Sequence, residues 1–246
     1  HEYEVVVVGG GPAGLQAAVI EQGADAGIAL DGDGDRVIMV DHRGEVLDGD
    51  QLLWIIAAER ARQGTLRGPV AGTQMSNLGL ERALRSLDID FHRARVGDRY
   101  VLEMLREHAG TLGGESSGHI VCLDCTTTGD GTVSALQVLG AMVRAGRPLA
   151  DLLDGMTAMP QHRVDVPIER GSRPMSDARI TRAVEALEAE LGERGRVLLR
   201  ASGTEPLLRV MVEGEEAAQV EAKARALAAE VRALCGVTEP AGANVN

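Results

Sequence analysis

Short apolar strands alternate with helical segments along this chain, and that order limits the fold more than any other feature of the sequence. A β-branched run at 5–8 is followed by a helical segment at 15–22 and an extended apolar segment at 27–30. From Asp50 onward the helical segments become longer and amphipathic, with short strands between them. This alternation is typical of an α/β fold built from βαβ units.

The pattern also predicts three domains. Residues 1–49 would form a partial βαβ domain that ends in an acidic loop, and residues 50–158 an α/β domain. The stretch Ala145-Gly146-Arg147-Pro148 breaks the last long helix, which favours a boundary near residue 158. Residues 159–246 run strand, helix, strand, strand, helix, and so predict a small C-terminal α+β domain with its helices on one face.

Composition argues against two classes of partner. The formal net charge is -12 and aromatic residues make up 2% of the chain, whereas nucleic-acid binders need clustered basic residues and stacking platforms. No apolar run approaches the roughly 20 residues of a membrane span. Three cysteines and the lack of a recognisable secretory leader predict a cytoplasmic protein. A few arginines in one cleft would still suit a small anionic substrate.

An acidic loop, Asp31-Gly32-Asp33-Gly34-Asp35-Arg36, directly follows a predicted strand. Glycines allow the backbone to turn so that alternate carboxylates converge on one hard cation, and magnesium is the natural candidate. A solvated acidic hairpin is the alternative. A calcium-binding EF-hand is excluded, because its sixth and twelfth positions would be Arg36 and His42 instead of Gly and Glu.

A second polar loop, 113–119, offers a carboxylate at Glu115, hydroxyls at Ser116 and Ser117, and an imidazole at His119. These groups are able to hydrogen-bond sugar hydroxyls. A Gly/Ser loop that merely connects two strands is an equally good interpretation of the residues alone.

A third polar loop, 200–206, combines the guanidinium of Arg200 with hydroxyls and backbone N–H groups, and Arg209 follows closely. Such a set is suited to binding a phosphate. A turn capped by Ser202 and Thr204 is the structural alternative.

These three loops, in this order, resemble the signature of the α-D-phosphohexomutase superfamily. Within it, residues 23–50, 76–79 and 96–100 and the sequence TTTGDG at 126–131 are similar to the phosphoglucosamine mutases. The resemblance runs from about Leu15 to Cys235. It implies a magnesium enzyme that interconverts glucosamine 6-phosphate and glucosamine 1-phosphate through glucosamine 1,6-bisphosphate. A sugar phosphate would be its small-molecule partner, and a homodimer is compatible with it.

The resemblance also assigns roles to individual residues. Catalytic roles fall to Arg36, beside the transferring phosphoryl group, and to His119. The implied metal ligands are Asp31, Asp33 and Asp35; the implied substrate-binding residues are Asp98, Arg99, Glu115 and Ser117 for the sugar and Arg200, Ser202, Gly203, Thr204 and Arg209 for the phosphate that does not react.

Family members carry the transferred phosphate on a serine loop in a first domain, and no serine of these 246 residues has that loop around it. We therefore expect the chain alone not to sustain the mutase reaction. A sugar-phosphate-binding remnant without catalysis would have the same three loops.

The first residues point elsewhere. The run of four valines at 5–8 and the following GGGPAG match the G-x-G-x-x-G dinucleotide fingerprint, and Asp31 lies near the spacing of a ribose-binding acid. This resembles flavin-dependent pyridine-nucleotide oxidoreductases, so an FAD- or NAD-dependent oxidoreductase is the remaining alternative. The similarity stops within about 30 residues, the length of one βαβ unit. In this alternative, Asp31 would have to bind a ribose as well as the metal.

Overall fold

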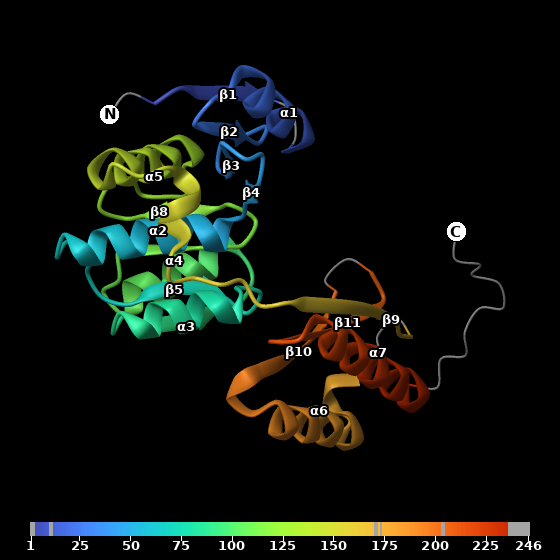
Figure 1. Ribbon diagram of the computed structural model, residues 1–246. Coiled ribbons are helices and arrows are strands. Elements are labelled where there is room, and N and C mark those ends of the chain that lie inside the picture. Colours follow the sequence, from blue (N-terminus) through green and yellow to red (C-terminus); the bar gives the residue numbers. More distant parts are fainter. Residues whose placement is uncertain (1–2, 10–11, 170–171, 173, 203–204, 236–246) are drawn as a thin grey trace. The chain divides into compact units, whose positions relative to one another are not determined.

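The structure, a computed structural model, describes all residues except 1–2, 10–11, 170–171, 173, 203–204 and 236–246. The chain forms two compact units, His1–Ala158 and Met159–Asn246 (Figure 1). Each unit has its own hydrophobic core. The predicted α/β alternation is confirmed. No described helix is long and apolar enough to cross a membrane.

The first unit contains two four-stranded sheets, ordered β1-β2-β3-β4 and β6-β5-β7-β8. Its elements, in chain order, are β1 (Val5–Gly9), α1 (Pro12–Gln22), β2 (Ala26–Leu30), β3 (Val37–Asp41), β4 (Val46–Leu47), α2 (Gly49–Arg62), β5 (Val70–Thr73), α3 (Leu78–Ser86), β6 (Phe91–Ala94), α4 (Asp98–Glu107), β7 (Leu112–Gly114), β8 (Ile120–Cys122), α5 (Gly131–Ala145) and the 3-10 helix η1 (Leu149–Leu153).

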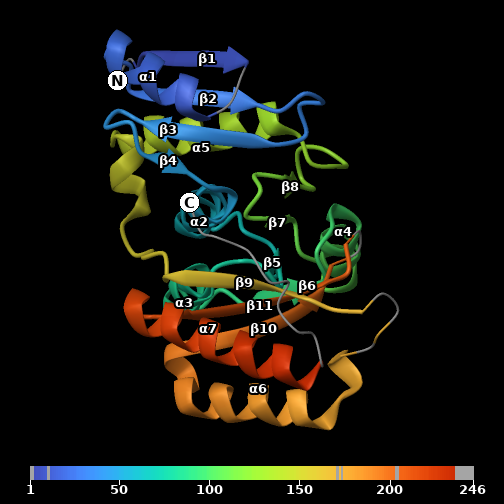
Figure 2. The ribbon, with the colours of Figure 1, turned by 90° about the vertical axis from the view of Figure 1, so that its right-hand side faces the viewer.

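The first sheet holds the acidic loop at the tip of a hairpin. Strands β1 and β2 are parallel and joined through α1, whereas β2 and β3 are antiparallel with Leu30 opposite Val37 (Figure 2). Residues 31–36 are therefore a tight connection between two paired strands. In the fingerprint that precedes them, Gly10 and Gly11 lie outside the described residues, so dinucleotide binding stays an untested alternative.

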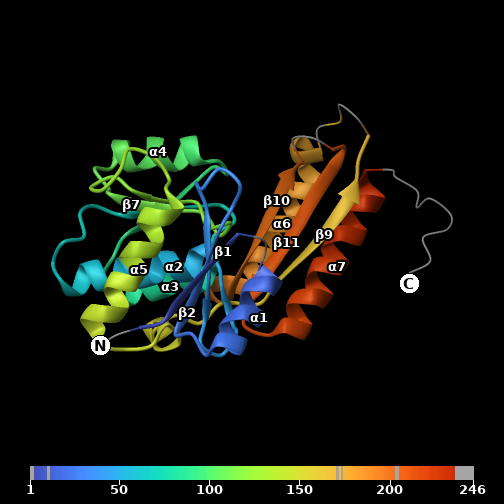
Figure 3. The same cartoon turned by 90° about the horizontal axis from the view of Figure 1, so that it is seen from above.

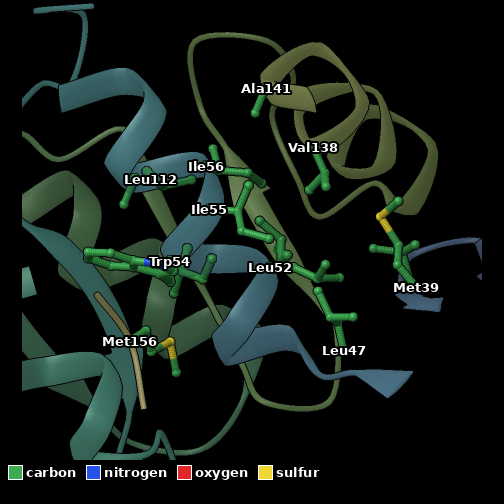
Figure 4. Packing of buried hydrophobic residues seen from close by; sticks show 14 of the residues in the cluster. Met39, Leu47, Leu52, Trp54, Ile55, Ile56, Leu112, Val138, Ala141 and Met156 are labelled. Carbon is green, nitrogen blue, oxygen red and sulfur yellow. The ribbon is translucent and has the colours of Figure 1, made fainter. Parts of the chain in front are cut away.

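One core joins the segments that the sequence divides into two domains. Met39 and Leu47, from β3 and β4, belong to the same buried cluster as Leu52 and Ile56 of α2 and Val138 of α5 (Figure 4). Helix α2 begins with a capping box: the Asp48 carboxylate accepts the Gln51 N–H, and the Gln51 side-chain oxygen accepts the Asp48 N–H. Because residues from both segments contribute to this core, the core does not mark a boundary at residue 49, and the division predicted there stays a proposal.

The second sheet contains a strand that the sequence does not predict. Gly113 and Gly114 belong to β7, which pairs with β5 in parallel and with β8 in antiparallel fashion, so the polar loop is shorter than expected. Glycines give no alternating pattern of side chains, which is why this segment resembles a loop. Residues 115–119 form the connection from β7 to β8.

The second unit is a three-stranded antiparallel sheet, ordered β10-β11-β9, with helices on one face. Helix α7 runs beside β9 and β11 (Figure 3), and α6 packs on the same apolar face, which carries Leu199, Val210 and Val212. Its elements are β9 (Gln161–Pro167), the 3-10 helix η2 (Pro174–Ser176), α6 (Ala178–Leu191), the 3-10 helix η3 (Gly192–Arg194), β10 (Gly195–Ala201), β11 (Leu207–Gly214) and α7 (Ala217–Leu234).

Candidate active site

The acidic loop brings its three aspartates together. One carboxylate oxygen from each of Asp31, Asp33 and Asp35 lies within 4.8 Å of the other two. Asp31 and Asp33 are exposed, whereas Asp35 is half-buried and its Oδ1 atom has no hydrogen-bond partner among the described residues. Three converging carboxylates, one of them with an unsatisfied oxygen, are ligands that suit a hard divalent cation such as Mg²⁺. The residues therefore fit the metal that the sequence resemblance implies.

Arg36 closes this loop. Its backbone N–H donates to Asp31 Oδ1 (3.2 Å), and its Nε lies 3.5 Å from Asp31 Oδ2 and 3.8 Å from Asp35 Oδ1. Desolvation acts to raise the pKa of Asp31. The hydrogen bonds with the Arg36 N–H and the Asp35 side chain, together with the charge of Arg36, outweigh desolvation, so the pKa of Asp31 is lowered from its ordinary value. About half of the Arg36 side chain, 53%, stays exposed and available to an anion.

His119 lies directly behind the acidic loop. Its Nδ1 is 3.0 Å from Asp35 Oδ2, and the residue is only 4% exposed. Its Nε2 is buried without a partner among the described residues. This geometry gives His119 a role in orienting Asp35, while the catalytic role implied by the resemblance stays a prediction.

The loop 115–118 is fixed beside the acidic hairpin by backbone contacts. Val37 N–H donates to Gly118 O (3.1 Å), and Gly49 N–H donates to Ser116 O (3.0 Å). Gly118 has φ +93°, and a Cβ there would lie 2.2 Å from Val37 O, so only glycine fits. Asp31, Arg36 and Ser117 share the wall of a pocket of about 240 Å³, whose other lining residues are apolar residues of β2 and β3.

Glu115 connects this loop to the start of α4. Its Oε1 accepts the Gly97 N–H (2.8 Å), and its Oε2 accepts the Ser117 hydroxyl (3.3 Å). Asp98, the first residue of α4, is exposed and follows Gly97 directly. Arg99 does not join this group: its Nε donates to Glu103 Oε1 (2.8 Å) along the helix, and its side chain is 79% exposed.

The second unit holds the third predicted group. Arg200 on β10 lies opposite Arg209 on β11, and Arg209 lies opposite Asp165 on β9. The Nε atoms of both arginines are buried and have no hydrogen-bond partner among the described residues. Like charges placed opposite one another destabilise a sheet, so an anion bound between them would be stabilising.

Two further polar residues lie near the sheet residues Arg200 and Arg209. Asp165, which no motif singles out, could have been placed here only from the alternation of side chains along β9; its Oδ1 lies 3.3 Å from Arg163 Nε. Ser202 Oγ accepts the Glu205 N–H (3.3 Å) in the turn between β10 and β11. Gly203 and Thr204 lie outside the described residues.

We expect Asp35→Ala to weaken the binding of a divalent cation by at least about tenfold, because it removes one of three carboxylates and the bond to His119. Titration with Mn²⁺, followed by the paramagnetic signal of the free ion, measures this. Glu21→Ala, at an exposed position of α1, is the control and should bind as the unchanged chain does. Equal affinity of all three proteins would mean that the acidic loop is not the metal site.

Comparison with known proteins shows what this arrangement is similar to. Residues 48–159 match the model of the α/β/α domain III of phosphoglucomutase/phosphomannomutase, and residues 163–230 match the model of its C-terminal domain. A phosphoglucosamine mutase of Alkalilimnicola ehrlichii is 64% identical over 221 residues, which cover 90% of this chain and 49% of that protein. One of Halorhodospira halophila is 55% identical over 253 residues, covering 96% of this chain and 56% of that protein. The chain spans about half the length of these curated relatives.

Solved structures share the fold at lower identity. The Aspergillus fumigatus N-acetylphosphoglucosamine mutase in complex with GlcNAc-6P and magnesium superposes with a TM-score of 0.73 and 21% identity, over 85% of this chain and 52% of that one. A phosphoglucomutase/phosphomannomutase family protein of Burkholderia thailandensis gives a TM-score of 0.71 and 22% identity, over 92% of this chain and 51% of that one.

Proposed function

This chain belongs to the phosphohexomutase family, and we propose that it supplies the metal, sugar and phosphate sites of a phosphoglucosamine mutase. The reaction would interconvert glucosamine 6-phosphate and glucosamine 1-phosphate. The observation that carries the proposal is the cluster formed by the acidic loop, Arg36 and the Glu115 loop, in a chain closely similar to proteins of that name.

The first unit offers what phosphoryl transfer demands, which is neutralisation of charge and exact placement of the reacting groups. Asp31, Asp33 and Asp35 would hold Mg²⁺, which supplies positive charge to phosphoryl oxygens when bound. The exposed part of Arg36 would contact the same phosphoryl group. The free lone pairs of Glu115 and the hydroxyl of Ser117 would bond the sugar hydroxyls.

The second unit would hold the phosphate that is not reacting. Arg200 and Arg209 stand side by side, the Nε atom of each has no hydrogen-bond partner among the described residues, and a phosphate accepts from two guanidinium groups at once. One hydroxyl of the sugar phosphate would accept a phosphoryl group from the donor, and the glucosamine 1,6-bisphosphate so formed would have to turn round and return its other phosphoryl group to that same residue. A separate binding site for the distal phosphate would orient the sugar with either end toward the reacting group.

We further propose that the phosphoryl donor of the whole enzyme lies outside these 246 residues, since none of their serines has the family's loop around it. The 246 residues alone would then bind the substrate without converting it. A cytoplasmic location, a homodimer and a role in cell-wall amino-sugar synthesis belong to the same proposal and rest on the family resemblance.

Calorimetric titration of the purified chain with glucosamine 6-phosphate and Mg²⁺ tests the proposal. We expect saturable binding and no conversion to glucosamine 1-phosphate, with glucosamine itself, which lacks the phosphate, as the control ligand that binds far more weakly. No binding in a folded sample would contradict the assignment of the sites. Turnover by the chain alone would contradict the assignment of the donor to another segment.

A further inference from the structure

The sequence TTTGDG at 126–131 belongs to the family resemblance but has no role in the function proposed above. Its last three residues, Gly129-Asp130-Gly131, lead into α5, and the Asp130 side chain caps that helix by accepting the Val133 N–H (2.9 Å). Gly129 forms an isolated antiparallel bridge with Val121 of β8. The segment is therefore held both by the helix that follows it and by a strand of the sheet.

Gly129 lies against the imidazole of His119. A Cβ at this position would lie 2.3 Å from both the Cε1 and the Nε2 atoms of that ring. Contacts under about 3 Å do not persist in a packed interior, so the ring would have to move. The ring is buried, and its other nitrogen lies 3.0 Å from Asp35 Oδ2, so a shift of the ring acts on Asp35.

Gly131 lies against the backbone of the acidic loop. Its N–H donates to Gly34 O (2.9 Å), and a Cβ there would lie 2.6 Å from Arg36 O and 2.7 Å from Leu30 Cδ2. The carbonyl of Arg36 belongs to the loop itself and does not have the freedom of a side-chain end. A side chain at 131 would therefore displace the loop that carries the three aspartates.

We propose that Gly129 and Gly131 are positioning residues for the divalent-cation site, an inference that rests on the proposed metal-binding function of Asp31, Asp33 and Asp35. Gly129 sets Asp35 through His119, and Gly131 sets the backbone of the loop directly. Two glycines separated by one residue thus support the metal ligands by two separate routes.

The two routes can be separated in a double-mutant cycle. We expect Gly129→Ala and Gly131→Ala each to weaken Mn²⁺ binding by about tenfold, the lower end of the effect of altering groups that orient metal ligands. In a His119→Ala background, Gly129→Ala should have no further effect, whereas Gly131→Ala should keep its full effect. Gly14→Ala in α1, where a Cβ meets no atom of the described residues within 4 Å, is the matched control.

A second readout needs no metal. In the metal-free protein, Gly129→Ala should shift the ¹⁵N signals of the His119 imidazole, and Gly14→Ala should leave them unchanged. Unchanged Mn²⁺ affinity in folded Gly129→Ala and Gly131→Ala proteins would overturn the proposal, as would a full effect of Gly129→Ala in the absence of His119. If the unchanged chain bound no Mn²⁺, the proposed metal function would be wrong. If the His119 signals also did not respond to Gly129→Ala, the positioning role of Gly129 would be wrong as well.

Discussion

Replacing Arg200 by alanine is expected to lower the affinity of the chain for glucosamine 6-phosphate between about tenfold and a hundredfold. Arg200 and Arg209 lie opposite one another with buried Nε atoms that have no partner in the described part of the chain. A hydrogen bond between charged groups contributes about 1.5–3 kcal/mol, which corresponds to that range of affinity. Calorimetric titration at fixed Mg²⁺ measures the loss.

The control for this experiment is Arg225→Ala. Arg225 lies on α7, its side chain is 66% exposed, and it pairs with Glu221 one helical turn away. It carries the same charge in the same unit but belongs to no candidate site, so its removal should leave the affinity within a factor of about two, as surface substitutions do. Equal losses in the two variants would mean that only net charge matters and that Arg200 does not hold the phosphate.

Asp50 is expected to make the stability of the first unit depend on pH. It is 1% exposed, and its Oδ2 accepts the N–H of Asn77 at the start of α3 (2.8 Å). Burial raises its pKa to about 7, the charge of Asp48 adds to this, and the hydrogen bond from Asn77 opposes it. In the unfolded chain the pKa of an aspartate is about 3.9.

The sign follows from these two values. Between about pH 4 and pH 7 the folded state keeps the Asp50 proton that the unfolded state loses, so the contribution of Asp50 to stability is full below pH 4. It declines as the pH rises through about 7 and is constant above that. The total change is on the order of a few kcal/mol.

Asp50→Asn keeps an oxygen acceptor for the Asn77 N–H and removes the charge. Relative to this variant, the unchanged chain should lose a few kcal/mol of unfolding free energy between pH 5 and pH 8. Urea unfolding followed by the fluorescence of Trp54, the one tryptophan of the chain and 3% exposed in the same unit, provides the measurement. Asp88→Asn, at an exposed residue with φ +57° just beyond α3, is the control. A difference between the unchanged chain and Asp50→Asn that does not vary with pH would contradict the prediction.

Much of the fold could be predicted because strands and helices leave local patterns in the sequence. The acidic loop is predictable for the same reason, since Asp31, Asp33 and Asp35 are close together along the chain. The sequence does not predict strand β7, because its two glycines give no alternating pattern of side chains. The resemblance assigns Arg99 to the sugar, and the structure shows its Nε donating to Glu103, one turn further along α4, so its sugar-binding role stays a prediction.

The features of the structure and of the site that the sequence does not predict depend on contacts between distant segments. Asp50 looks like an ordinary acidic residue in the first turn of a helix, and its burial becomes apparent only where α3 begins beside it. Gly129 and Gly131 look like loop glycines until His119 and Arg36 are seen against them. Asp165 gains meaning only when β9 pairs with β11 and brings it opposite Arg209.

The shared core of the first unit bears on how genes of this kind can be recombined. Strands β2 and β3 bury Ile28 and Met39 in the same cluster as Trp54 of α2 and Met142 of α5, so a crossover near residue 49 would join halves whose side chains had not evolved together. Residue 158 separates two cores that have no residue in common. Exchange between relatives should therefore be tolerated at the second position far more often than at the first.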